Sequence, residues 1–334
     1  MSIANYEGGF SDGVTIRGVP ISITHPGKVF WVSNSSVQLP NQKAGSNSND
    51  GKFNAPFATL TYALSQVKKD RGDVIFIKPG HAESISSATA LNIGATAGDA
   101  GTGADGVAII GLGRGSKRPT FTLDTANTAT IGVTGNNIAF KNCLFVANFL
   151  AVASCFTLGA AADFVLEGCE FRDTSAILNF LAIVTTTVSV NADRLYCGDN
   201  NIKIDGTTND IAAFQILGTM SGLTLVRNKV VNTVARSNVS VFLSHAALVM
   251  TDAYVADNVV WCANAANTSV GVFISTSATT GSGVAKNNVI ATNDPSATII
   301  VTAAAVQWKM FNNLHAGEAT SLSGFLLPAA GTDA

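Results

Sequence analysis

Acidic side chains gather between residues 163 and 210, and paired carboxylates are the groups that could do chemistry in this chain. Two carboxyl groups about 5 Å apart can act as nucleophile and general acid in the hydrolysis of a glycosidic bond. Asp173 and Asp199 are 26 residues apart. If that distance is one structural repeat, they would stack at about 4.8 Å, the spacing of neighbouring strands. The acidic residues of this stretch are Asp163, Glu167, Glu170, Asp173, Asp193, Asp199, Asp205 and Asp210.

A simpler interpretation is that these carboxylates are exposed groups that keep the surface soluble, and we favour it. Two unneutralised carboxylates at strand spacing repel each other, so a catalytic pair would need a cation or a raised pKa. Neither the cysteines nor the histidines show the spacing of a zinc site. We therefore expect no catalytic residues, no cofactor-binding residues, no metal ligands and no cofactor. The histidines are scattered along the chain at His25, His81, His245 and His315.

The C-terminal part of the sequence repeats a short alternating apolar run that ends at an asparagine. The asparagines are Asn228, Asn258, Asn288 and Asn313, at intervals of 30, 30 and 25 residues. A second apolar run recurs at 241–243, 272–274, 299–301 and 325–327. A period of this size with two β runs per repeat is typical of a solenoid, and no helical periodicity interrupts it. The sequence predicts an all-β fold, a right-handed parallel β-helix of about nine coils.

The repeated asparagines have two expected roles at a sharp corner of each coil. Asparagine tolerates left-handed backbone angles, and its amide can bond nearby backbone groups. Because coils stack at strand spacing, the corner amides can also hydrogen-bond along the stack and form a ladder. Asn142 and Gly168 are expected to occupy the same corner in earlier coils.

One amphipathic helix is expected, close to the N-terminal end. Thr59 suits an N-cap, and Leu60, Ala63, Leu64 and Val67 have the spacing of one helical face. A buried strand follows at 73–77. Because the first coil of a solenoid exposes an unpaired apolar end, the helix is expected to cap it.

These residues carry a resemblance to a known family. The order Asn54-Ala-Pro-Phe-Ala-Thr-Leu60, helix, Gly72-Asp-Val-Ile-Phe-Ile-Lys-Pro-Gly80 resembles the N-terminal cap of pectin-lyase-like right-handed β-helix proteins. With the coils, the resemblance covers residues 54–328. The block from Gly13 to Trp31 is similar to β-helix proteins of tailed bacteriophages, which are virion structural proteins. The Asn-Thr-Asp, Asp-Asp, Gly-His-Gly and Arg-Ile-Lys signatures of polygalacturonase-like members are absent from the acidic stretch.

Composition limits the partners that are expected. Charged residues make up 13% of the chain, net charge is −2 and mean hydropathy is +0.31. The small net charge favours neither nucleic acid nor a membrane surface as a partner, and there is no run of 18 apolar residues. A solenoid with so few charges is expected to bury lateral surface against other protomers, and we expect a homotrimer. The first residues lack a basic region followed by an apolar core, so no signal peptide is expected.

The expected organisation is an N-terminal arm and loop for attachment (1–53), a parallel β-helix domain (54–328) and a C-terminal tail (329–334). The phage resemblance implies a non-enzymatic capsid decoration or head-fibre protein. Residues 1–30 would bind the major capsid protein or another virion protein. Such a chain is assembled in the host cytoplasm and located in the virion. The alternatives are a tailspike-type polysaccharide depolymerase and a receptor protein that binds a host-surface glycan.

The five cysteines are expected to be free, largely buried thiols, because their number is odd and no secretion signal precedes them. Cys143 and Cys169 follow the expected corners directly and should stack, with Cys197 on the next coil. Stacked Cα atoms at about 4.8 Å fall within disulfide range, so geometry alone leaves a bridge open.

Overall fold

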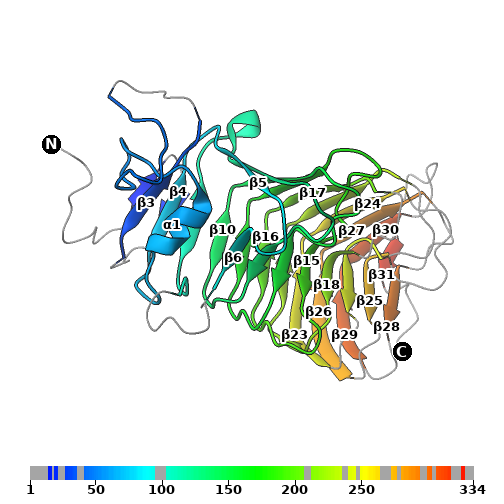
Figure 1. Ribbon diagram of the computed structural model, residues 1–334. Helices are drawn as coiled ribbons and strands as arrows, with labels where there is room; N and C mark the ends of the chain where they lie inside the picture. Colours follow the sequence, from blue (N-terminus) through cyan, green and yellow to red (C-terminus); the bar gives the residue numbers. More distant parts are fainter. Residues whose placement is uncertain are drawn as a thin grey trace.

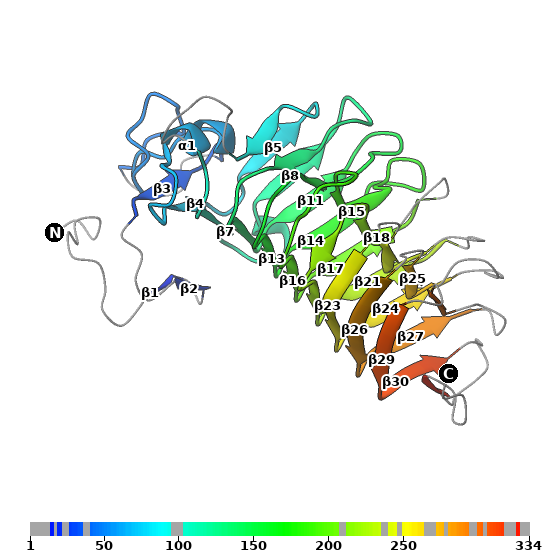
Figure 2. The same cartoon turned by 90° about the horizontal axis from the view of Figure 1, so that it is seen from below.

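Three long sheets run along the chain in a computed structural model (Figures 1 and 2). Every pairing within them is parallel except that of β30 with β31. The prediction of an all-β, right-handed parallel β-helix is confirmed. The structure describes residues 14–16, 19–21, 27–35, 41–94, 103–206, 212–234, 240–245, 249–263, 272–276, 280–293, 299–302, 306–316 and 325–327.

Each coil contributes one strand to each sheet. Sheet 1 contains β3 (Val29–Val32), β4 (Val74–Ile77), β7 (Ala108–Gly111), β10 (Ala139–Lys141), β13 (Val165–Glu167), β16 (Tyr196–Gly198), β20 (Thr224–Val226), β23 (Val249–Ala256), β26 (Thr280–Lys286) and β29 (Val306–Phe311), with the short β19 (Met220–Ser221) beside β23. Sheet 2 contains β5 (Ala82–Ile85), β8 (Thr120–Leu123), β11 (Leu144–Ala147), β14 (Glu170–Asp173), β17 (Asn201–Ile204), β21 (Lys229–Asn232), β24 (Val259–Cys262), β27 (Val289–Thr292), β30 (Asn313–Ala316) and β31 (Phe325–Leu327). Sheet 3 contains β6 (Leu91–Ile93), β9 (Ile131–Val133), β12 (Phe156–Leu158), β15 (Ala182–Thr186), β18 (Ala212–Ile216), β22 (Leu243–His245), β25 (Ile274–Thr276) and β28 (Ile300–Thr302).

Eight successive coils, from β4–β6 to β26–β28, supply all three sheets, and β29 and β30 begin a ninth. Inside the coils, like side chains stack on like. The rings of Phe121, Phe145 and Phe171, from three successive strands of sheet 2, lie 5.6 and 5.1 Å apart between centroids. Because strand side chains alternate, the residues between them face outward. Each sheet therefore has one apolar face in a shared core and one outer face.

The corner between sheets 1 and 2 is built by two consecutive residues with different roles. The first has a left-handed backbone: φ is 54° at Arg227, 58° at Asp257 and 55° at Asn287. The second is the buried asparagine that stacks along the coils. The expectation that the corner asparagines themselves adopt left-handed angles is therefore wrong for the four ladder residues, because the residue before each of them makes the turn, and right for Asn142, whose φ is 55°.

The asparagine ladder itself is present and one member longer than expected. The Nδ2 of Asn228 donates to the Oδ1 of Asn258 at 3.1 Å, and the Nδ2 of Asn258 donates to Asn288 at 2.9 Å. Asn288 continues to Asn313 at 2.8 Å. Asn200 extends the ladder in the other direction, donating to Asn228 at 3.0 Å. Each amide also donates to a backbone carbonyl of the neighbouring coil, so its polar atoms are paired although it is buried.

The N-terminal cap is a single helix, α1 (Leu60–Gln66), beside β3 and β4 (Figure 1). Thr59 is its N-cap and accepts from the backbone N–H of Tyr62 at 3.2 Å, as predicted. Leu60, Ala63 and Leu64 are buried in the solenoid core. The helix therefore covers the apolar end of the first coil.

Asp73, which is fully buried, ties this cap to the first coil. Its carboxylate accepts from the backbone N–H groups of Lys28 at 2.7 Å and Lys68 at 2.9 Å. Arg71 adds two parallel bonds of 2.6 Å each. One carboxylate thus joins the approach to β3, the segment after α1 and the start of β4.

Two details of the ends differ from the expected pattern. Strand β3 lies in the range expected for the arm, yet it pairs in parallel with β4, so sheet 1 begins at Val29. The run at 325–327 was expected to repeat the runs of sheet 3, but β31 pairs antiparallel with β30 in sheet 2. A short 3-10 helix, Gly115–Lys117, lies between β7 and β8.

Strands β1 (Val14–Ile16) and β2 (Val19–Ile21) form an antiparallel hairpin, which is a sheet of its own. No helix in the described part of the chain has the length and apolar character to span a membrane.

Candidate functional site

Asp173 and Asp199, the pair with glycosidase-like spacing, do not stack. Asp173 ends β14 and pairs with Ala147, whereas Asp199 lies at the corner between sheets 1 and 2, directly after β16. The expected stacking is wrong because the coil from Cys169 to Asn200 spans 31 residues rather than 26. The register interval grows from 26 residues at Phe145–Phe171 to 28 at Phe156–Val184 and 31 at Val165–Tyr196, so the extra residues lie before and, mainly, after β15.

Several of the acidic residues are instead ion-paired to a neighbouring coil. Arg194 binds Asp163 through two bonds of 2.6 and 2.7 Å. Its hydrogen bonds hold the pKa of the Asp163 carboxyl below the usual range. A similar pair lies at the corner between sheets 1 and 2, where Arg227 binds Asp199 through two bonds of 2.8 and 2.7 Å. Each pair joins two successive coils on the outside of the solenoid.

The other acidic residues also hold the coils together. Lys141 donates to Glu167 at 2.6 Å, across adjacent strands of sheet 1. Asp193 accepts from the backbone N–H of Ser221 at 2.8 Å. Asp173 accepts from the backbone N–H groups of Phe180 and Asp205, at 2.9 and 2.6 Å. Asp210 lies outside the described residues.

Asp205 binds both Lys203 and Thr233. Burial acts to raise the pKa of Asp205, but the hydrogen bonds from these two side chains outweigh it and hold the pKa below its usual value. The described carboxylates of the acidic stretch are thus distributed along the solenoid, where most of them join neighbouring coils.

The three described histidines lie on different coils. His81 is buried, accepts from the backbone N–H of Asn34 at Nδ1 and lies 3.1 Å from Glu83. His245 ends β22 in the core, and burial lowers its pKa to about 4. Burial also lowers the pKa of His315, on β30. His25 lies outside the described residues.

All five cysteines are free and buried. Cys143 and Cys169 are in register at the corner, as predicted, but the next residue in that stack is Asn200, whose Oδ1 accepts the backbone N–H of Cys169 at 2.9 Å. The suggestion that Cys197 follows them is wrong, because Cys197 lies on β16 and pairs with Leu166 and Leu225. Burial raises the pKa of Cys169 to about 12, so its thiol has little nucleophilic character.

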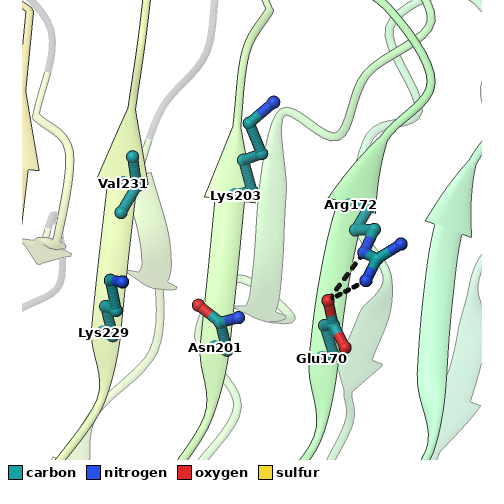
Figure 3. A pocket seen from close by; sticks show the side chains of 6 residues that line it. All are labelled: Glu170, Arg172, Asn201, Lys203, Lys229 and Val231. Atoms are coloured by element: carbon teal, nitrogen blue, oxygen red, sulfur yellow. Dashed lines mark hydrogen bonds and ion pairs between the residues drawn. The ribbon is translucent and has the colours of Figure 1, made fainter. Parts of the chain in front are cut away.

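A shallow depression on the outer face of sheet 2 brings together polar side chains that the sequence did not single out as a group. Three adjacent strands, β14, β17 and β21, each contribute two side chains (Figure 3). The volume of the depression is about 470 Å³. It is lined by Glu170, Arg172, Asn201, Lys203, Lys229 and Val231.

The depression presents charged and hydrogen-bonding side chains to solvent. Glu170 is bound by Arg118 at 3.0 Å and by Arg172 at 2.5 Å, so one carboxylate is shared by two guanidinium groups. Cations of Arg172, Lys203 and Lys229 border the depression from three successive coils. Over the described residues, no group of three or more His, Cys, Asp or Glu side chains is placed to hold a metal ion.

Comparison with known proteins gives one likeness, and it concerns the fold alone. No protein-family model matches the chain. No curated protein sequence matches it either. Among solved structures, the chain is similar to one titled "Rhamnogalacturonan lyase", with a TM-score of 0.45 and 13% identity over 81% of this chain and 71% of that one. A likeness this weak carries no argument, and the class of the protein, a parallel β-helix, rests on its strand pairing.

Proposed function

We propose that the chain is a non-enzymatic structural protein of a bacteriophage virion, a capsid decoration or head-fibre protein attached through residues 1–30. The similarity of the block from Gly13 to Trp31 to phage β-helix proteins suggests the setting. The proposal that the protein is not an enzyme is supported by the ion pairs that the acidic residues make. Asp163 and Asp199, for example, are each bound by an arginine of the next coil, which makes them structural ties.

The N-terminal segment supports attachment through an arm. Strands β1 and β2 pair only with each other, and not with any described strand of the three sheets. The solenoid begins at β3, after this hairpin. A hairpin that pairs with no described strand of the solenoid is suited to binding a second protein.

We further propose that the virion protein is a homotrimer. Val259, Val289 and Leu314 follow one another on successive strands of sheet 2, with 44%, 42% and 42% of their surface exposed. Phe311, next to this column in the last coil, is 57% exposed. Exposed apolar side chains in one column are a surface that a second chain can cover, and a closed ring of three chains covers one such column on each.

Deletion of residues 1–27 tests the attachment. The truncated chain is expected to keep its β circular dichroism spectrum and its oligomeric state, and to lose binding to particles that lack the protein. Deletion of residues 329–334 is the matched control at the other end, and it should leave attachment unchanged. Particles that bind the truncated chain as well as the full chain would show that the arm is not the anchor.

Sedimentation tests the trimer separately. At micromolar concentration the full chain is expected to sediment at three times the monomer mass, and Val289→Glu should shift it towards the monomer because it places charge in the apolar column. A wild-type chain that sediments as a monomer would contradict the oligomer proposal.

A further inference from the structure

The proposed trimer needs two different surfaces on each chain, because the contact between neighbours in a three-fold ring is heterologous. The apolar column of sheet 2, formed by Val259, Val289 and Leu314, supplies one of them. The neighbouring chain must cover this column with another part of its own surface. That part must be apolar, and it must lie where three chains can close around one axis.

The outer face of sheet 1 carries a long column without charge. Strand pairing places one outward-facing residue of each strand in this column, which we call the uncharged column of sheet 1. From β3 to β26 it is about 38 Å long at the usual strand spacing, and Lys309 of β29 follows it. Its members are Val29, Val74, Ala108, Ala139, Val165, Tyr196, Thr224, Tyr254 and Val284.

The two tyrosines of this column are half-buried. A Cβ atom at Gly198 would lie 2.6 Å from the Tyr196 hydroxyl and 2.8 Å from its ring, so this side chain lies along the sheet. The Tyr196 hydroxyl accepts from Nη2 of Arg227 at 3.1 Å. The ammonium group of Lys286 lies 5.2 Å from the centre of the Tyr254 ring. Neighbouring side chains thus hold both tyrosines against a face that a second sheet can approach closely.

The second outward column of sheet 1 is short-chained beside the tyrosines. It holds Gly198, Val226 and Ala256 on successive strands, and Val226 and Ala256 are buried. One strand before them, Lys141 and Glu167 neutralise each other at 2.6 Å. The middle of sheet 1 therefore presents apolar and aromatic groups with little free charge.

The outer face of sheet 3 is a poorer partner for an apolar column. Hydroxyl and amide groups predominate on it, and Thr185 donates to Gln215 at 2.9 Å. Covering such groups with apolar side chains would cost their hydrogen bonds to water. The outward column of sheet 3 contains Asn92, Gly132, Thr157, Thr185, Gln215, Ser244, Ser275 and Val301.

Sheets 1 and 2 also have the right relative position. They meet at the asparagine corner, so β26 and β29 lie beside β27 and β30 along one edge of the solenoid (Figure 2). If this edge points towards a three-fold axis, sheet 1 of one chain faces sheet 2 of the next around the ring. Sheet 3 is not adjacent to this edge.

Charge disappears from the edge in its last two coils. The turn-forming corner residues are Asp199, Arg227 and Asp257 in three earlier coils, but Asn287 and Asn312 in the last two. Nδ2 of Asn312 donates to Oδ1 of Asn287 at 3.0 Å. The uncharged corners belong to the same coils as the exposed side chains of Val289, Leu314 and Phe311. Three copies of a neutral corner can meet at an axis without repulsion.

We propose that the outer face of sheet 1 is the surface that receives the apolar column of sheet 2 from the neighbouring chain. This inference rests on the trimer of the proposed function and adds which surfaces meet. In three parallel solenoids around one axis, equal coils lie at equal heights. Val259 therefore packs on Tyr254 of the neighbour, Val289 packs on Val284, and Leu314 packs beside Phe311.

Cross-linking between two single-cysteine variants of the full chain tests this pairing. Facing sheets pack about 10 Å apart, beyond the reach of a disulfide, so a short bismaleimide is the probe. The native cysteines are buried, and the wild type should give no product. Chains with Val284→Cys and chains with Val289→Cys carry tags of different length and are co-expressed. We expect a covalent dimer with one tag of each kind, at least fivefold more abundant than any dimer from either variant alone.

Two further pairings locate the contact. Val165→Cys replaces the same residue type in the same column about 19 Å along the axis, so it should give no dimer with Val289→Cys. Thr185→Cys, on sheet 3, should give none either. Sedimentation of each mixture before cross-linking shows independently whether it is trimeric.

Several results would overturn the inference. A trimer that gives no dimer from Val284→Cys with Val289→Cys, or that links Val289→Cys to Thr185→Cys or Val165→Cys instead, would remove the assignment of sheet 1 and leave the trimer standing. Val289→Cys that links to itself as readily as to Val284→Cys would show that like surfaces meet. Mixtures that sediment as monomers would contradict the trimer and the inference together.

Discussion

The Oδ1 atom of Asn258 accepts two hydrogen bonds from Asn228, one from its backbone N–H at 2.9 Å and one from its side-chain Nδ2 at 3.1 Å. Both residues are buried, at 0% and 1% exposure. The same pair of bonds recurs between Asn258 and Asn288 and between Asn288 and Asn313. A single amide oxygen therefore accepts hydrogen bonds from both the backbone and the side chain of the neighbouring asparagine. These bonds hold the corners of successive coils together.

Asn258→Leu is expected to lower the free energy of unfolding by about 1–3 kcal/mol, because it leaves buried groups unpaired. The backbone N–H of Asn228 loses its acceptor, and the carbonyl of Leu225 loses a donor that lies 2.9 Å away. Urea unfolding followed by circular dichroism measures the change. Asn293→Leu, the same substitution at an exposed position, is the control and should shift the midpoint little. Equal midpoints for the two variants would argue against a stabilising ladder.

Cys169→Asn is expected to extend the ladder by one coil. Cys169 already occupies the ladder position, since its backbone N–H donates to the Oδ1 of Asn200 at 2.9 Å. A new amide could donate to that oxygen and to the carbonyl of Phe140, which the Cys169 thiol faces at 3.8 Å. We expect Cys169→Asn to be more stable than Cys169→Ala by about 0.5–1.5 kcal/mol, the usual net value of a hydrogen bond. An asparagine variant less stable than the alanine variant would show that the site cannot hold the amide.

Asp73→Asn is expected to loosen the N-terminal cap, with a loss of about 3 kcal/mol, because it leaves Arg71 beside a neutral partner in a buried contact. Asp199→Asn is the matched control. Both aspartates are held by an arginine through two bonds, but Asp73 is fully buried whereas the Asp199 side chain is 43% exposed. The loss for Asp199→Asn should stay below about 1 kcal/mol. Hydrogen exchange of α1 and β4 measures the cap directly, and equal exchange rates in the two variants would contradict the assigned role of Asp73.

Stability is expected to fall as pH drops from 6.5 towards 4, because of His245. Burial lowers its pKa from 6.5 to about 4 in the folded protein. Between these values the unfolded chain binds a proton that the folded chain excludes, so acid favours unfolding, by up to about 3 kcal/mol over this interval. The lowered pKa of His315 acts in the same direction.

His245→Gln should therefore reduce the difference between the urea midpoints at pH 7 and pH 4.5. The wild type at both pH values is the reference. A wild-type midpoint that does not change over this range would show that His245 is not buried in its neutral form.

The repeat made the fold predictable, and unequal coil lengths made the site hard to predict. Asn228, Asn258, Asn288 and Asn313 recur with similar flanking residues, so the ladder could be derived from their spacing alone. Asn200 was missed because the strand before it, near Tyr196, lacks the apolar alternation of the later repeats. The signal that would have found it is the pair Asp-Asn at 199–200, which also occurs at 257–258.

Contacts between coils depend on how many residues each connection uses. The ladder steps span 31, 28, 30, 30 and 25 residues, so a fixed interval misplaces side chains such as Asp173 and Asp199. The basic residues of the depression come from strands without any common motif, and only strand pairing brings Arg172 and Lys203 side by side. The turn-forming role of Arg227 was equally hidden, because arginine has no special preference for left-handed angles.

The most direct test of the proposed function is a cryo-EM map of the virion to which we propose this chain belongs. The account predicts three parallel solenoids that stand on the particle surface, with density for residues 1–30 in contact with a capsid or other virion protein. Particles in which neither the map nor mass spectrometry detects the chain, together with purified protein that releases reducing ends from host polysaccharide, would contradict it.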